Sequence, residues 1–402
     1  MNFGKLGLMA LAAASAVVGI GTAQAQSQEA IERSGNTFHQ AVCARATGRG
    51  EARCFAHVVT DARGNPMAGK SDGAAPNITP SGFGASDLRA AYLVTATGSS
   101  ATTIAIVDAQ GYPNAEADLA VYRTQMGLPA CTTANGCFKK SDQRGGTAYP
   151  RYNSGWAQEQ ALDLDMASAM CPNCKILLVQ SDTASIANLG TAVNQAAALG
   201  AAVISNSYGG SEAGAAASNA YYVHPGIAVT ASSGDSGYGA SFPATSPDVI
   251  AVGGTNLKRV TGGRGWAELA WTSAGSGCST VFNKPVWQTD SLCGKRVESD
   301  ISAVADPATG VAVYGPTGKG SQSGWLVFGG TSVSAPLIGG IYGALGAHPN
   351  AAQKIWSAAA ASGLNDVTSG SNGSCGGTYF CTAGAGYDGP TGNGTPSGPA
   401  AF

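Results

Sequence analysis

The chain has 402 residues, of which only 11% are charged, and its formal net charge is −2. This balance gives no electrostatic basis for binding nucleic acid or an anionic membrane surface. The charged fraction is less than half the usual share and glycine is about twice its usual share, a composition that fits a loop-rich secreted protein.

Residues 1–25 predict a signal peptide. Lys5 precedes an apolar core from Leu6 to Ile20, and Ala23-Gln24-Ala25 has the small-x-small pattern of a cleavage site. The apolar run is too short for a membrane anchor, and no later run reaches about 18 uninterrupted apolar residues. We therefore expect cleavage after Ala25 and a protein that is secreted to the periplasm or the extracellular space without a membrane partner.

Ten cysteines fit an oxidising compartment, because an even number in an exported chain favours disulfides. Proximity predicts five local bridges: Cys43–Cys54, Cys131–Cys137, Cys171–Cys174, Cys278–Cys293 and Cys375–Cys381. The Cys171-Pro-Asn-Cys174 spacing also occurs in redox and zinc motifs. No second pair has zinc spacing, so we expect a structural bridge there.

Residues 26–75 form a polar segment with its own cysteine pair, and they predict a short N-terminal extension or prosegment. Glycine and proline are frequent in residues 64–80, as in a linker. Residues 76–402 then predict one large domain, and we expect it to be a monomer.

Within this domain, apolar runs alternate with helix-like segments. Such alternation predicts an α/β fold: a doubly wound, mostly parallel sheet with helices on both faces. The expected strands are 104–107, 175–179, 201–205, 227–231 and 249–252, and the expected helices are 114–125, 156–170, 186–199, 212–222 and 332–345. Residues 363–402 are rich in glycine and small polar residues and predict ordered loops.

Ligands of such sheets bind at the carboxyl ends of the strands. The residues that follow the expected strands there include Asp108, Ser207–Gly210 and Ser232–Gly237. We therefore expect the functional residues in these loops and at the starts of the neighbouring helices.

Ser332 is a candidate nucleophile. It follows Gly329-Gly330-Thr331 and begins a predicted helix, so free backbone N–H groups surround its hydroxyl. Taken alone, the same pattern fits a serine that caps a helix. The chain has no Gly-x-Ser-x-Gly turn around Ser332, which argues against a serine esterase.

A base is needed to accept the proton of this hydroxyl. The four histidines are poorly placed: His39 and His57 lie in the N-terminal extension, His224 precedes a proline, and His348 follows the helix of Ser332. We therefore expect no histidine triad.

Carboxylates are better candidates. Glu159 and Asp163 are four residues apart on a predicted helix and share one face, whereas Asp165 points elsewhere. Two neighbouring acids hold a proton to a higher pH than either alone. Glu159 could act as the base and Asp163 as its support and relay, although two solvated acids would give the same pattern.

Asp235 lies in the glycine-flanked loop Ser233-Gly234-Asp235-Ser236-Gly237. A carboxyl group donates a hydrogen bond to an oxyanion only when it is protonated, so this role requires burial or low pH. An aspartate beside glycine is also common in simple turns.

Together these motifs resemble the sedolisins, which are serine-carboxyl peptidases with a subtilisin-like fold. The matches are Glu159-x-x-x-Asp163, Ser233–Gly237 and Gly330-Thr331-Ser332-x-Ser334-Ala335-Pro336, and the resemblance covers about residues 80–400. It implies catalytic roles for Ser332, Glu159, Asp163 and Asp235, and an acid-active endopeptidase that cuts protein or peptide substrates through an acyl-enzyme. The alternatives are a tripeptidyl-type exopeptidase and an inactive surface or binding protein on the same scaffold.

The resemblance also implies a C-terminal calcium-binding loop region with one structural Ca²⁺. Its ligands would be the side chains of Asp366 and Asp388 and the carbonyls of Val367, Gly384 and Gly386. One departure concerns the N-terminus, because many sedolisins carry a long folded prodomain and residues 26–75 are short by comparison.

Overall fold

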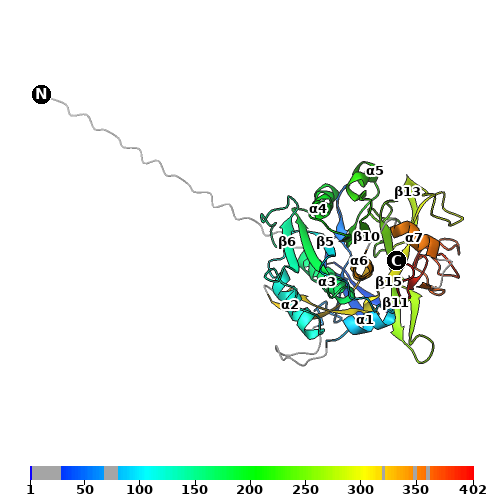
Figure 1. Ribbon diagram of the computed structural model, residues 1–402. Helices are drawn as coiled ribbons and strands as arrows, with labels where there is room; N and C mark the ends of the chain where they lie inside the picture. Colours follow the sequence, from blue (N-terminus) through cyan, green and yellow to red (C-terminus); the bar gives the residue numbers. More distant parts are fainter. Residues whose placement is uncertain (2–28, 68–79, 319–321, 347–350, 359–362) are drawn as a thin grey trace.

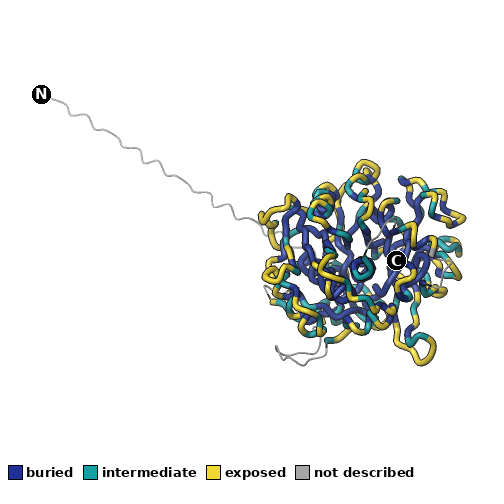
Figure 2. The backbone as a smooth tube through the Cα atoms, viewed as in Figure 1, coloured by how far each residue is buried: buried dark blue, intermediate teal, exposed yellow. Residues whose placement is uncertain are grey.

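The computed structural model describes Met1 and residues 29–67, 80–318, 322–346, 351–358 and 363–402. The predicted signal peptide and its cleavage site lie outside these residues, as does the expected domain boundary at residue 75. Figure 2 shows the buried interior of the described part and the exposed loops that surround it. No helix in the described ranges is both long and apolar enough to span a membrane.

The central sheet is mostly parallel, as the sequence predicted. Its strand order is β12-β11-β10-β8-β5-β7-β6, and β15 also pairs with β11. Only β12 pairs in the antiparallel direction. The strands are β5 (Thr103–Ala109), β6 (Phe138–Asp142), β7 (Lys175–Ser181), β8 (Val203–Asn206), β10 (Ala228–Ser232), β11 (Ile250–Arg259), β12 (Trp266–Ala270) and β15 (Ile301–Val304).

Helices cover both faces of this sheet, with α3 on one side of β5 and α4 on the other (Figure 1). The side chains of β5 point alternately to the two faces of the sheet, which explains this arrangement. Ile104 and Ile106 lie in the core cluster of α3 and α6, whereas Ala105 and Val107 lie in the core cluster of α4. A strand buried on both faces needs such a continuous apolar run.

The α-helices are α1 (Ala85–Ala91), α2 (Ala115–Gln125), α3 (Ser154–Met170), α4 (Ile186–Ala198), α5 (Ala215–Ser218), α6 (Thr331–Leu345) and α7 (Ala351–Ala358). Side-chain caps begin two of them: the Asn153 side chain accepts from Trp156 N–H, and Ser185 accepts from Asn188 N–H. The helix expected over 212–222 is shorter, since α5 gives way to the 3₁₀ turn η1 (Asn219–Tyr222). A second 3₁₀ turn, η2, spans Pro307–Thr309.

A second, antiparallel sheet was not expected from the sequence. Its order is β1-β2-β4-β17-β16, so the N-terminal segment pairs with strands that directly precede α6. The strands are β1 (Ile31–Ser34), β2 (Thr37–Ala41), β4 (His57–Thr60), β16 (Val311–Pro316) and β17 (Ser323–Gly329). Helix α3 contacts β5 of the central sheet and β16 of this second sheet, and its residues from Gly155 to Met170 are buried.

Three short strand pairs complete the fold: β3 (Arg53–Cys54) with β9 (Tyr208–Gly209), β13 (Gly277–Asn283) with β14 (Lys295–Glu298), and β18 (Leu364–Asn365) with β19 (Thr395–Pro396). Apart from the last pair, residues 363–402 are loops, in agreement with the sequence.

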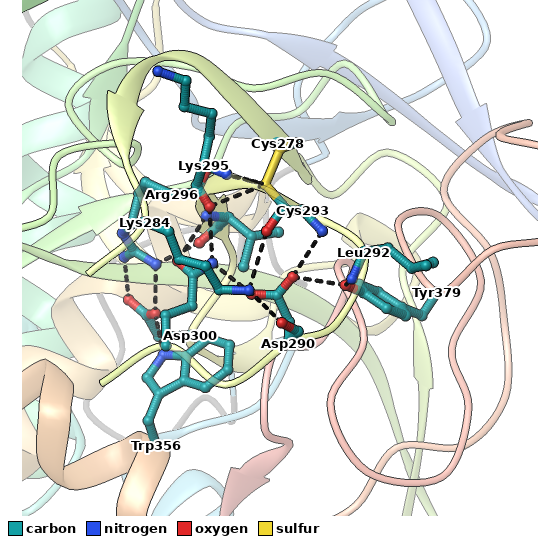
Figure 3. A network of polar contacts seen from close by, with 12 residues as sticks. Cys278, Lys284, Asp290, Leu292, Cys293, Lys295, Arg296, Asp300, Trp356 and Tyr379 are labelled. Carbon is teal, nitrogen blue, oxygen red and sulfur yellow. Dashed lines mark hydrogen bonds and ion pairs between the residues drawn. A yellow bond between two sulfur atoms is a disulfide. The ribbon is translucent and has the colours of Figure 1, made fainter. Parts of the chain in front are cut away.

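A polar network joins the 278–293 disulfide loop to α7 and to the C-terminal loops (Figure 3). Arg296 and Asp300 form a fully buried ion pair at 2.6 Å, and Trp356 Nε1 donates to Asp300 Oδ1 at 2.6 Å. Asp290 accepts from Cys293 N–H and from the Tyr379 hydroxyl. These bonds satisfy buried charges that would otherwise be costly.

All five predicted disulfides are present, and the described residues contain no free cysteine. The Cys171–Cys174 bridge lies against Gly98, where a Cβ would be only 2.1 Å from Cys171 Sγ. This packing supports a structural bridge.

Candidate active site

Ser332 is the second residue of α6, directly after the last strand of the second sheet. The turn before it requires Gly330, which has φ +100°, and a Cβ there would lie 1.9 Å from the carbonyl oxygen of Phe55. Ser332 is buried; its Oγ donates to Ser207 O at 3.3 Å and accepts from Phe55 N–H at 3.1 Å.

Glu159 and Asp163 lie side by side on α3 and are both fully buried. Glu159 Oε2 accepts from Ala56 N–H at 2.8 Å, and Asp163 Oδ1 accepts from the Ser207 hydroxyl at 2.8 Å. Burial raises the pKa of Glu159, and the charge of Asp163 raises it further, whereas a hydrogen bond with Ser332 opposes the rise. Asp165 points elsewhere, as predicted, and accepts from Tyr314 N–H.

Asp108 at the end of β5 extends this acid pair. Its two carboxyl oxygens are buried and have no hydrogen-bond partner among the described residues. Burial raises its pKa, and the charge of Glu159 raises it further, while Asp108 in turn raises the pKa of Asp163. Three neighbouring buried acids cannot all be ionised, so the cluster retains protons.

Asp235 follows β10 and faces the start of α6. Its Oδ1 accepts from Thr331 N–H at 2.8 Å and from the Thr331 hydroxyl at 2.7 Å. Burial raises the pKa of Asp235 to about 7, and the two Thr331 bonds oppose this rise. The charge of Asp235 also raises the pKa of Glu159, so the structure brings all four candidate residues into one cluster.

A histidine does lie at this cluster: His57, which the sequence places in the N-terminal extension and which was not expected here. His57 Nε2 is 3.4 Å from Asp235 Oδ2, and His57 Nδ1 is 2.9 Å from His39 Nδ1. Burial lowers the pKa of His57 well below its ordinary value and lowers that of His39 to about 4. His57 contacts Asp235 and not Ser332, so it does not form the triad that the sequence argued against.

Glu32, His39 and His57 also place their potential ligand atoms within 4.8 Å of one another. The hydrogen bond between the two imidazoles accounts for their close approach without a metal ion. Arg53 adds a positive charge that lowers the pKa of His57, which disfavours a cation at this place.

The N-terminal segment covers the cluster. Arg53 and Cys54 pair with Gly209 and Tyr208, and Phe55 N–H donates to Ser207 O at 3.3 Å. A cavity of about 700 Å³ remains beside this segment, lined among others by Phe55, Gly234, Asp235 and Asn372. Ser332, Glu159 and Asp163 do not line the cavity because residues 53–56 lie over them.

The C-terminal loop residues that the resemblance singled out also converge. Gly386 N–H donates to Asp366 Oδ2, and Gly384 N–H donates to Asp388 Oδ2. Burial raises the pKa of Asp388 to about 7, and the negative charge of Asp366 raises it further. Hydrogen bonds from Gly384 and Thr391 oppose this rise. Val367 is buried beside Asp366.

Local sequence patterns do not identify Phe55, Ala56 and His57 as neighbours of the site. Their only signal was the Cys43–Cys54 pair, which indicated an ordered segment but not its location. The pairing of β3 with β9 and of β4 with β17 is a long-range contact that local patterns do not specify.

Known proteins are similar to this chain in sequence and in fold. Residues 146–373 match the subtilase family. Sedolisin from Pseudomonas sp. (strain 101) is 32% identical over 326 residues, which cover 68% of this chain and 54% of the relative. Kumamolisin from Bacillus sp. (strain MN-32) is 31% identical over 287 residues, which cover 60% of this chain and 49% of the relative. The chain thus spans about half the length of these curated relatives.

The solved structure of Pseudomonas sedolisin, a serine-carboxyl proteinase complexed with pseudo-iodotyrostatin, aligns with a TM-score of 0.67 and 26% identity. The alignment covers 79% of this chain and 96% of that chain. The central sheet, its helices and the order of the motifs are therefore those of a subtilisin-like fold. The chain belongs to the subtilase family, and it is similar to the sedolisins.

Proposed function

We propose that this protein is a secreted, acid-active serine-carboxyl endopeptidase. One observation carries the proposal: the N–H groups of the adjacent residues Phe55 and Ala56 contact Ser332 Oγ and Glu159 Oε2, respectively. Ser332 thus lies beside the residue on the acyl side of the Phe55–Ala56 bond and Glu159 beside the amide nitrogen of that bond, and peptide hydrolysis needs a nucleophile and a base placed in this way.

In the proposed reaction, Ser332 Oγ attacks the carbonyl carbon of the substrate and Glu159 accepts the hydroxyl proton. Glu159 then gives this proton to the leaving amine, and an ester of Ser332 with the acyl part remains. Water attacks this ester with Glu159 again as the base, which releases the acid and restores Ser332. Asp163 supports Glu159 and shares its proton, because the two acids are neighbours on one helix face.

Asp235 supplies the oxyanion donor in this scheme. Because its pKa is raised to about 7, Asp235 is protonated in acid and its carboxyl can donate a hydrogen bond to the developing oxyanion. As the pH rises through that pKa the donor is lost. Burial also raises the pKa values of Glu159, Asp163 and Asp108, so these neighbouring acids share protons that Glu159 can accept and release.

The test is a pH profile on a casein-like protein, comparing the chain with its Ser332→Ala variant. We expect hydrolysis in acid that disappears in the variant, and internal fragments of many sizes among the products. A series of tripeptides would instead identify the tripeptidyl-type exopeptidase. Activity that peaks above about pH 7 would contradict the carboxyl mechanism.

The C-terminal loops fit a structural Ca²⁺. Asp388 is buried near a second carboxylate, Asp366, and a cation would relieve the repulsion that contributes to its raised pKa. Carboxylates with backbone carbonyls are the donor set that Ca²⁺ prefers, and the carbonyls of Val367, Gly384 and Gly386 complete it in our proposal. The ion would stabilise the loops and take no part in the reaction.

We also propose that residues 1–25 are removed on export, that residues 26–75 are a prosegment, and that the enzyme acts as a monomer on protein or peptide substrates. The five disulfides support export. Removal of the prosegment would require a cut near residues 73–80, most of which lie outside the described residues.

A further inference from the structure

Ser207 contacts the nucleophile with its backbone and the acid pair with its side chain. It lies between β8 and β9, at the carboxyl end of a central strand, and it is fully buried. Its carbonyl oxygen accepts the Ser332 hydroxyl at 3.3 Å, and its own hydroxyl donates to Asp163 Oδ1 at 2.8 Å. Ser207 therefore joins α6, which carries the nucleophile, to α3, which carries the acids.

The position of Ser207 in the sheet explains its contact with Asp163. Side chains that are two residues apart on an extended strand point to the same face of the sheet. Ser205 of β8 faces α6, because a Cβ on Gly339 of that helix would lie 3.7 Å from Ser205 Cβ. Ser207 continues this row beyond the end of β8, so its hydroxyl points to the side on which α6 packs against α3.

The hydroxyl of Ser207 determines which oxygen of Asp163 is left to carry a proton. Oδ1 accepts this hydroxyl, and Oδ2 has no hydrogen-bond partner among the described residues. Glu159 has a similar arrangement, since its Oε2 accepts Ala56 N–H and its Oε1 has no partner in the same part of the chain. Each acid is thus held through one oxygen, and the other two oxygens remain for the proton that the pair shares.

The same hydrogen bond favours the ionised form of Asp163. Burial raises the pKa of Asp163, and the charge of Asp108 at the end of β5 raises it further, whereas the hydrogen bond from Ser207 opposes the rise. Burial also raises the pKa of Glu159, and the charges of Asp163 on the same helix and of Asp235 after β10 add to this rise. Because the charges around the pair are negative, a hydroxyl that donates to it stabilises the first ionisation of the pair.

We propose that Ser207 is a positioning residue of the peptidase reaction, whose hydroxyl holds Asp163 so that Asp163 Oδ2 and Glu159 share the proton taken from Ser332. Ser207 itself gains and loses no proton, and none of its covalent bonds forms or breaks. Its effect on the reaction passes through Asp163. This inference rests on the peptidase function proposed above.

The first test compares the pH profiles of Ser207→Ala and Ser205→Ala with that of the parent chain after the same acid incubation. The two serines are a matched pair, because both are fully buried and both lie in the same row of side chains. Ser205 Oγ, however, has no hydrogen-bond partner among the described residues. Neither substitution removes the backbone carbonyl that contacts Ser332, so the comparison isolates the hydroxyl that reaches Asp163.

We expect Ser207→Ala to lower kcat about 10–100-fold, to change KM less than about twofold, and to move the acid limb of the pH profile up by about one unit. The limb moves up because the protonated pair releases its first proton less readily when the resulting charge has lost a hydrogen bond. The alkaline limb, which reports Asp235, should stay in place, since that carboxyl is held by Thr331. Ser205→Ala should keep the kcat and both limbs of the parent.

Further variants separate this role from simple packing. Ser207→Thr keeps the hydroxyl, so it should keep the acid limb of the parent even where the added methyl group lowers the rate. In an Asp163→Asn background, Ser207→Ala should move the acid limb much less than in the parent, because the partner of the hydroxyl is then no longer a carboxylate. Urea unfolding in a Ser332→Ala background shows which variants fold. If Ser207→Ala does not fold, Ser207→Cys, which donates only weakly, should give a smaller shift in the same direction.

An acid limb that stays in place in folded Ser207→Ala, or that moves equally in Ser205→Ala, would overturn this inference and leave the peptidase function intact. A shift that is just as large in the Asp163→Asn background would also overturn it, because the hydroxyl would then act through another group. If the parent chain and Ser205→Ala both fold and hydrolyse no peptide in acid, the proposed function fails, and the role of Ser207 fails with it.

Discussion

Replacement of Asp235 by asparagine should remove a defined part of the pH dependence of stability. In the folded protein burial raises the pKa of Asp235 from an ordinary 3.8 to about 7. Such a group stabilises the folded protein fully when the pH is below the pKa that the group has in the unfolded chain. This contribution is lost as the pH rises through the pKa that the group has in the folded protein. The difference between the two pKa values means that Asp235 lowers the free energy of unfolding by about 4 kcal/mol between strongly acid and neutral pH.

The measurement is urea unfolding of the Ser332→Ala chain, with and without Asp235→Asn, at about pH 4 and about pH 8. Other buried carboxyls also make stability fall with rising pH in both proteins. The contribution of Asp235 is therefore the difference between the two proteins in the stability lost from about pH 4 to about pH 8. Asp61→Asn is the control, because hydrogen bonds from Asn65 and Arg63 lower the pKa of that exposed carboxyl. An Asp235→Asn chain that loses as much stability between the two pH values as its parent would refute the reasoning.

Three further predictions concern catalysis, calcium and processing. Ser332→Ala should reduce proteolysis by about 10⁴–10⁶-fold, whereas Ser334→Ala, which removes a hydroxyl bonded to Thr331 O, should retain most activity; equal losses would exclude Ser332 as the nucleophile. A chelator should lower the melting temperature, because an ion at about a hundredfold excess over Kd adds about 2.7 kcal/mol to the free energy of unfolding. Asp388→Ala should abolish this sensitivity to the chelator. Identical melting curves with and without chelator would contradict an exchangeable ion. Intact-mass analysis after acid incubation should show a cut near residues 73–80 that is absent in Ser332→Ala; a cut that persists in the variant would point to another protease.

The sequence predicted β5, β7, β8, β10 and β11 of the central sheet because they contain apolar runs with helices between them. It did not predict β12, β15 or β6, which contains Lys139 and Lys140. Glu159 and Asp163 could be paired from their spacing alone, since four residues on a helix define one face. Their burial could not be predicted in this way, because it depends on β16, which packs on α3 from more than 140 positions later in the chain. The location of Phe55 depends on pairings with residues such as Ser207 and Ser332, and local periodicity carries no information about such partners.

The second sheet has a consequence for the folding of the protein without its N-terminus. Strand β17 lies between β4 and β16, so both of its edges are paired, through Phe328 and Gly329 on the β4 side. If residues 31–60 depart, β17 becomes an edge strand, and its unpaired backbone groups beside the buried Phe328 invite pairing with another chain. A chain that begins at residue 76 should therefore aggregate more readily than the full chain. The N-terminal strands would cover the edge of β17 during folding and prevent its pairing with another chain.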